Sequence, residues 1–173
     1  SPTLAGLKTG SLFSCPYSSQ KMIIKEIREF NQKLTQKGIR IIPVRISDKR
    51  MLVYVYRPEK LKEDFSDEKT QIILKCKGYD CTNLSQCICR LIQKLQSDPD
   101  FPHEIGLFLG YPAEDVKGFI ENKAACSKCS GCWKVYGDEQ AARILFKKYK
   151  KCTEIYCRRW KSGVAVEQLT ITI

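Results

Sequence analysis

Three cysteines recur at intervals of three residues in one short segment, namely Cys126, Cys129 and Cys132. A fourth thiol, Cys152 or alternatively Cys157, follows a predicted helix, and Cys152 is the preferred candidate. Three close thiolates and a remote one are compatible with an iron–sulfur cluster, and four thiolates also suit Zn²⁺. Separate reduced thiols, each packed as a small apolar side chain, account for the same residues without a metal. The spacing therefore indicates either a zinc or iron–sulfur site or a set of independent thiols.

The second candidate for chemistry is the pair His103–Glu104, which contains the only histidine of the chain. An imidazole can shuttle a proton or bind a ligand, and a carboxylate can act as a base or accept hydrogen bonds. Adjacent side chains on an extended segment point to opposite faces, so the two need not touch. A structural role is the alternative, in which His103 holds a loop by hydrogen bonds and Glu104 caps a turn. The next residues exclude the HExxH zinc motif.

We expect this pair to belong to a small-ligand site built on the 103–115 loop. A neighbouring strand at 133–136 and the N-terminal segment would complete the site. The predicted ligand-binding residues are Lys8, His103, Glu104, Gly110, Tyr111, Lys134 and Tyr136. His103 and Glu104 are also the candidate catalytic residues. The pattern names no reaction, and it leaves open whether the protein is an enzyme.

Positive charge is concentrated near the C-terminal end of the chain. The net charge is +11, and residues 143–161 contribute +7 of it, from eight Lys or Arg against one Glu. Such a patch attracts anionic partners, so an acidic protein or a nucleic acid is a possible partner. The basic residues are Arg143, Lys147, Lys148, Lys150, Lys151, Arg158, Arg159 and Lys161. Aromatic residues lie between them, as in single-strand binders, but two of these fall on the inner face of a predicted helix.

Size and composition favour a single globular domain over residues 1–173. A chain of 173 residues can bury a real core without disulfides. Its ten cysteines are clustered, which fits reduced thiols better than evenly spread disulfides. No run approaches the roughly 18 apolar residues of a membrane span. We therefore expect a cytoplasmic protein without a membrane partner.

The first half of the chain carries clear element signals. Apolar residues spaced four, three and four apart predict an amphipathic helix over 20–36, ending at Gly38. Two β-type runs, 39–46 and 51–57, are joined by four polar residues and indicate a hairpin. Pro43 cannot donate to a ladder, so the first run is expected to be an edge strand or bulged. Further helices are predicted near 67–77 and 82–96.

The elements predicted in the second half of the chain position the candidate residues. The apolar run 105–109 predicts a short buried strand or tight loop, and Pro112 begins a helix. A strand at 133–136 precedes a helix capped by Asp138. Alternating apolar residues predict a last strand near 166–173. The expected fold is α+β, a mixed α/β sandwich, in which a small mixed sheet holds the hairpin and both later strands and packs with about five helices.

Two motifs carry a family resemblance. They read HEIGLFLGYP-EDV-GFI at 103–120 and GCWKVYGDE at 131–139, and PTLAGLKTGSLF at 2–13 and LVYVYRP at 52–58 agree with them. The chain is similar to an uncharacterised domain-of-unknown-function family found mainly in anaerobic clostridia and their relatives. The resemblance covers nearly the whole chain. It implies one cytoplasmic bacterial domain and supplies no catalytic residues.

Overall fold

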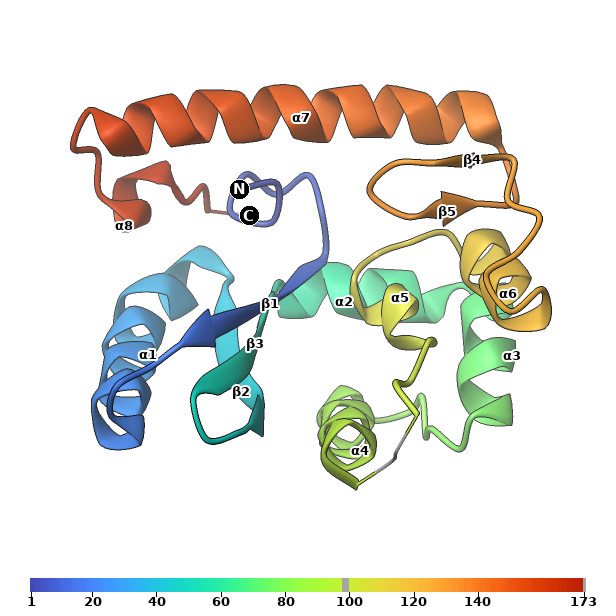
Figure 1. The fold of residues 1–173 in the computed structure, drawn as a ribbon, viewed down its shortest axis with the longest axis horizontal. Coiled ribbons are helices and arrows are strands. Elements are labelled where there is room, and N and C mark those ends of the chain that lie inside the picture. Colours follow the sequence, from blue (N-terminus) through green and yellow to red (C-terminus); the bar gives the residue numbers. More distant parts are fainter. Residues whose placement is uncertain (98–99, 173) are drawn as a thin grey trace. The chain divides into compact units, whose positions relative to one another are not determined.

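The computed structural model describes residues 1–97 and 100–172. Within these residues it contains eight α-helices, one 3-10 helix and five strands, which confirms the α+β class (Figure 1). The strands are β1 Gly10–Pro16, β2 Arg40–Ile46, β3 Arg50–Tyr56, β4 Cys129–Ser130 and β5 Lys134–Val135. The helices are α1 Gln20–Leu34, η1 Thr35–Lys37, α2 Pro58–Ser66, α3 Glu68–Cys76, α4 Leu84–Ser97, α5 Ile105–Phe108, α6 Ala113–Glu121, α7 Glu139–Lys161 and α8 Val166–Leu169.

The chain divides into two compact units. Unit 1 comprises residues 1–61 and 152–173, and unit 2 comprises residues 62–151. The boundaries fall inside α2 and inside α7. That residues 1–173 form a single domain stays a prediction.

Unit 1 is built on an antiparallel sheet in the order β1–β3–β2, with α1 beside it (Figure 1). The predicted helix and hairpin are confirmed, and Gly38 ends the helical segment with a φ of 73°. The expectation for Pro43 is also confirmed, because β2 is an edge strand and its register shifts between Pro43 and Arg45. Ile27, Leu34 and Val53 belong to the buried core between α1 and the sheet.

A buried arginine ties the ends of unit 1 together. Arg57, at the end of β3, is 2% exposed. Its guanidinium donates hydrogen bonds of 2.7 to 3.0 Å to four backbone carbonyls, those of Thr3, Leu4, Lys37 and Ile171. Arginine suits this position because its donors are fixed in a planar fork. One side chain thus joins the N-terminal turn, the segment after α1 and the C-terminal segment.

Unit 2 contains α3 to α6, the β4–β5 hairpin and the first part of α7. Its core includes an aromatic group in which Phe108 of α5 lies edge-on to Phe65 at 5.0 Å and tilted against Tyr79 at 5.5 Å. Leu91 and Leu95 of α4 are buried as the helical spacing predicts. Asp138 accepts a hydrogen bond from the Ala141 N–H at 3.0 Å and so caps α7, as expected.

Two element predictions are wrong. Within 105–109, residues 105–108 form a helical turn, α5. The Leu107 N–H donates to the Glu104 carbonyl three residues earlier, and the Leu109 N–H donates to the Ile105 carbonyl four residues earlier. Short apolar runs fit either state by pattern alone. Within 166–173, residues 166–169 form α8, and Ile171 donates to the Leu4 carbonyl instead of pairing in a sheet. Residue 173 lies outside the described residues.

The predicted sheet also needs correction. The pairings in both sheets are antiparallel, so the sheet is not mixed. The strand predicted at 133–136 is β5, which pairs with β4 in a hairpin of its own. The third strand of the main sheet, β1, was not among the predicted strands. The count of about five helices omitted α2 and the two four-residue helices.

No helix in the described part of the chain combines the length and apolar character needed to cross a membrane.

The Arg57 cluster yields a stability prediction. Arg57→Met leaves four carbonyls without their charged donor, so we expect the free energy of unfolding to fall by about 3 kcal/mol. Urea denaturation followed by circular dichroism measures this change. Arg40→Met is the matched control, because Arg40 is exposed and donates to a single hydroxyl, that of Thr35. Equal losses in the two variants would contradict the role given to Arg57.

Candidate functional site

A pocket of about 410 Å³ lies in unit 2 beside α5, α6 and the β4–β5 hairpin. Its volume is in the range of small-molecule sites. The pocket brings together three residues of the predicted site, His103, Tyr111 and Lys134. The rest of its lining is mostly apolar and aromatic, and consists of Phe101, Ile105, Gly106, Leu109, Asp115, Val116, Phe119, Ser130, Cys132 and Trp133.

A buried carboxylate holds the two sides of this pocket together. Asp115, in the first turn of α6, is 3% exposed. Its Oδ2 accepts a 2.6 Å hydrogen bond from the Trp133 indole N–H. Its Oδ1 accepts 2.7 Å hydrogen bonds from the backbone N–H groups of Tyr136 and Gly137. The hairpin and the segment that follows it are therefore fastened to α6 by one side chain.

The aromatic wall of the pocket centres on Trp133. The Tyr111 ring stacks on the indole with centroids 4.7 Å apart, and the Phe146 ring of α7 meets it edge-on at 4.6 Å. The Tyr111 hydroxyl donates to the Cys132 carbonyl at 3.4 Å. Burial raises the pKa of the Tyr111 phenol, so the ring is neutral at physiological pH. The wall is thus an uncharged, pre-formed stacking surface.

The turn between α5 and α6 depends on two glycines. Gly110 adopts a φ of 75°, a left-handed conformation that favours glycine. Gly106 has no room for a side chain, because a Cβ there would lie 2.7 Å from Val116 Cγ2 and 3.1 Å from Tyr111 Cδ2. Gly110 was predicted to bind ligand. Its observed role is to turn the chain so that Tyr111 reaches the pocket, and Gly110 itself is not among the lining residues.

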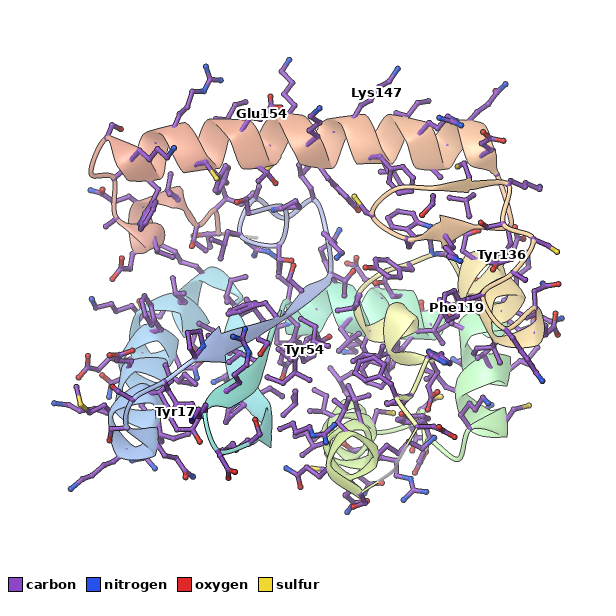
Figure 2. All side chains as sticks on the ribbon, viewed as in Figure 1. Tyr17, Tyr54, Phe119, Tyr136, Lys147 and Glu154 are labelled. Atoms are coloured by element: carbon purple, nitrogen blue, oxygen red, sulfur yellow. The ribbon has the colours of Figure 1, made fainter. Side chains whose placement is uncertain are left out.

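His103 lies at the opening of the pocket. Its side chain is exposed, and its ring meets the Phe119 ring edge-on with centroids 5.0 Å apart. Phe119 projects from α6 (Figure 2). His103 also lines a second, smaller hollow of about 310 Å³ together with Glu104 and Lys94. The imidazole is therefore shared between two neighbouring hollows.

Glu104 points into the protein, unlike its neighbour. It is 4% exposed, its Oε1 lies 2.7 Å from Lys94 Nζ, and the Tyr79 hydroxyl donates to the same oxygen at 3.1 Å. Burial alone would raise the pKa of the carboxyl, but the hydrogen bond and charge of Lys94 outweigh it and hold the pKa below its ordinary value. Glu104 is thus an ion-paired carboxylate next to the exposed His103.

The remaining predicted ligand residues lie apart from the pocket lining or at its edge. Lys134 lines the pocket, and its ammonium donates to the Ala124 carbonyl. Tyr136 does not line it. Its hydroxyl donates to the Ala125 carbonyl at 3.0 Å, and a Cβ at Gly118 would collide with its ring. Lys8 belongs to unit 1 and is half-buried there. The participation of Lys8 and Tyr136 in ligand binding stays a prediction.

The four predicted metal ligands differ in exposure. Cys126 and Cys132 are exposed, Cys129 is half-buried, and Cys152 is buried. Burial raises the pKa of the Cys152 thiol, which disfavours the thiolate that a metal requires. Within residues 1–97 and 100–172, no group of three or more His, Cys, Asp or Glu side chains is arranged to hold a metal ion. The described thiols therefore lend no support to a zinc or iron–sulfur site.

The predicted basic face lies on α7. All eight of its Lys and Arg side chains are exposed, and Lys147 projects away from the helix (Figure 2). Arg143 forms an ion pair with Glu139 at 2.6 Å, one turn earlier. The patch is therefore available to an anionic partner, and binding of one stays a prediction.

Sequence reasoning missed the residues that build the pocket. Asp115 was not among the predicted site residues, and Trp133 was noted only within a motif. Their hydrogen bond joins positions 18 residues apart, which no local pattern reveals. One signal was present, since a Trp beside two turn-forming segments needs a partner for its indole N–H when it is buried.

In a comparison with known protein families, a family model described as "Protein of unknown function (DUF3793)" matches residues 1–170 of the chain. Neither the search of curated proteins nor the search of solved structures produced a match.

The Lys94–Glu104 pair yields a pH-dependent prediction. Because the folded-state pKa of Glu104 is below its ordinary value of 4.5, its contribution to stability is complete above pH 4.5 and is lost as the pH falls through the folded-state pKa. Lys94→Met leaves the buried Glu104 carboxylate without its ammonium partner and should lower the free energy of unfolding by about 3 kcal/mol at pH 7. Because burial raises the pKa of a Glu104 carboxyl that has lost Lys94, this carboxyl takes up a proton at a higher pH in the variant than in the wild type. Urea unfolding of both proteins between pH 7 and pH 3 should therefore show that the difference shrinks steadily as the pH falls.

The matched control for this prediction is Lys69→Met. Lys69 pairs with Glu114 at 2.5 Å, but both side chains are more than half exposed, so its loss should change the free energy of unfolding little at any pH. A Lys94→Met difference that stays constant from pH 7 to pH 3 would refute the linkage.

Proposed function

The chain belongs to the DUF3793 family, whose function is unknown, and we propose that it is a small-ligand-binding protein whose site is the pocket beside His103, Tyr111 and Lys134. The observation that carries the proposal is the meeting of these three predicted residues around one pocket of about 410 Å³. Membership of a family of unknown function confirms the family resemblance in that respect. The clostridial origin and the cytoplasmic location stay predictions.

The shape of the pocket supports a flat ligand. Trp133 is 8% exposed, and its indole plane is fixed between the Asp115 carboxylate and the rings of Tyr111 and Phe146. Phe119 adds a further aromatic edge. Rings held in place before binding lose little entropy when a planar molecule stacks on them. A planar, mostly apolar molecule therefore fits the pocket better than a sugar-like one.

The charged groups of the pocket favour a ligand that carries a hydrogen-bond acceptor or an anionic group. The Lys134 ammonium has three N–H donors, and the Ala124 carbonyl accounts for one of them. His103 is exposed at the opening and can donate from a ring nitrogen. Among the described residues of the lining, Asp115 is the one carboxylate, and it already accepts three hydrogen bonds. The pocket thus offers donors to the ligand while its own negative charge is compensated.

The proposal concerns binding and assigns no reaction. The two other predicted functions have less support. The thiols show no metal arrangement in the described residues, and the basic face of α7 is exposed without a feature that selects a protein over a nucleic acid.

Titration with a pair of planar ions tests the proposal. The probes are 2-naphthoate and its cationic counterpart, 2-naphthylmethylammonium. The reporter is the indole N–H resonance of Trp133 in ¹⁵N NMR, observed in a Trp160→Phe background, which leaves Trp133 as the only tryptophan. We expect saturable shifts with naphthoate and much weaker ones with the cation. Lys134→Met should weaken naphthoate binding about tenfold, the effect of roughly 1.4 kcal/mol.

Lys128→Met is the matched control for this titration. Lys128 lies next to β4 and also donates to a carbonyl, that of Gly137, but it does not line the pocket. Its loss should leave naphthoate binding unchanged. Equal affinity for both ions, or equal weakening by the two lysine variants, would overturn the proposal.

A further inference from the structure

Unit 1 contains a second hollow, of about 390 Å³, between α1 and one face of the β1–β3–β2 sheet. Its walls are almost entirely apolar. They are formed by a stripe on α1 and by residues that alternate along the strands, and consist of Ser1, Thr3, Leu4, Ser11, Phe13, Cys15, Ile23, Glu26, Ile27, Phe30, Leu34, Ile41, Val53, Val55 and Val166. This hollow shares no residue with the pocket in unit 2.

The hollow exists because α1 is fastened to one side of the sheet. The Asn31 side chain of α1 donates to the Ile41 carbonyl at 2.7 Å and accepts from the Ile41 N–H at 2.9 Å, so it binds the backbone of the edge strand β2. On the opposite edge, β1, Phe13 lies 49% exposed. Phe30 of α1 is 38% exposed, although its helical spacing places it with Ile27 and Leu34. Two large aromatic side chains therefore border an open hollow.

The size of the hollow favours a small molecule as its occupant. A hollow of about 390 Å³ falls within the volume range of small-molecule sites. Its inner wall is the buried core itself, since Ile27, Leu34 and Val53 are 8%, 1% and 3% exposed. An occupant would thus extend the core of unit 1 with apolar atoms.

The polar groups of the lining restrict the head group of that molecule. Glu26 carries the only charge among the side chains that line the hollow in the described chain. The hydroxyls of Thr3 and Ser11 share a hydrogen bond of 2.9 Å and can accept or donate further. Near Glu26, a carboxylate on the ligand would be repelled by the Glu26 carboxylate, whereas a hydroxyl or an ammonium group would be accommodated.

The geometry points to a second binding site in unit 1, which takes a slender apolar molecule with an uncharged hydroxyl or an amine head group. The apolar part fills the space between α1 and the β1 side of the sheet, and the head group lies near Glu26. This site is independent of the proposed function of unit 2.

Three probes that share one alkyl chain and differ in the head group test this preference. They are 1-octanol, octylamine and octanoate, used at concentrations below micelle formation. Binding is followed by the methyl resonances of Leu34, Val53 and Val55 in ¹³C NMR. We expect saturable shifts with octanol and octylamine and weaker binding of octanoate. Glu26→Gln should bring the affinities of octylamine and octanoate together. Glu29→Gln, one turn away and paired with Lys25, should leave the preference unchanged.

Filling the hollow tests its location. Ile23→Trp places a larger side chain in the space and should weaken octanol binding at least about tenfold, because the added volume replaces the ligand. Ile24→Trp is the matched control, since Ile24 is also half-buried on α1 but does not line the hollow. Phe13→Ser removes an exposed wall residue and should weaken binding without disturbing the fold.

Three results would overturn the inference. The first is an absence of saturable shifts at the three methyl positions. The second is equal weakening by Ile23→Trp and Ile24→Trp, with both variants folded by circular dichroism. The third is a dimer in light scattering that Phe13→Ser converts to a monomer, because a second copy of the chain would then cover the hollow.

Discussion

The structure of unit 2 depends on one buried carboxylate. A carboxylate removed from water costs several kcal/mol unless its oxygens are hydrogen-bonded. Asp115 meets this requirement with three neutral N–H donors, from the Trp133 indole and the backbone of Tyr136 and Gly137. Its place in the first turn of α6 adds the favourable helix dipole. If the hairpin separated from α6, the buried Asp115 carboxylate would lose its hydrogen-bond donors. These hydrogen bonds therefore hold β4 and β5 in place, because a ladder of two residues per strand is too short to do so alone.

Unit 1 solves a related problem with the opposite charge. Arg57 is surrounded by four backbone carbonyls, as Asp115 is surrounded by N–H groups. In both cases a buried ion organises irregular backbone whose polar groups have no partner in a helix or sheet. Lys94–Glu104 is the different case, a buried ion pair, which contributes less net stability because both ions were desolvated. The two buried ions Asp115 and Arg57 therefore fix the loops that bind them, and the Lys94–Glu104 pair mainly positions Glu104 beside the pocket.

Prediction from the sequence succeeded where the determinants are local. Helical spacing located α1 and α4, and the missing N–H of Pro43 predicted an edge strand or a bulge. It failed at 166–173, where apolar alternation suggests a strand but the Arg57 guanidinium and the Leu4 carbonyl take the backbone groups. Three predicted site residues, His103, Tyr111 and Lys134, line one pocket, and their role in ligand binding stays a prediction. Asp115 and Trp133 were missed because their roles arise from non-local hydrogen bonds.

Amide hydrogen exchange at Tyr136 and Gly137 tests the central role of Asp115 most directly. Asp115→Ala removes the acceptor of all three N–H groups. We predict that exchange of these two amides accelerates by at least about tenfold, equivalent to roughly 1.4 kcal/mol of local opening, while the amides of α4 keep their protection. Unchanged exchange at Tyr136 and Gly137 in a folded Asp115→Ala protein would contradict the account.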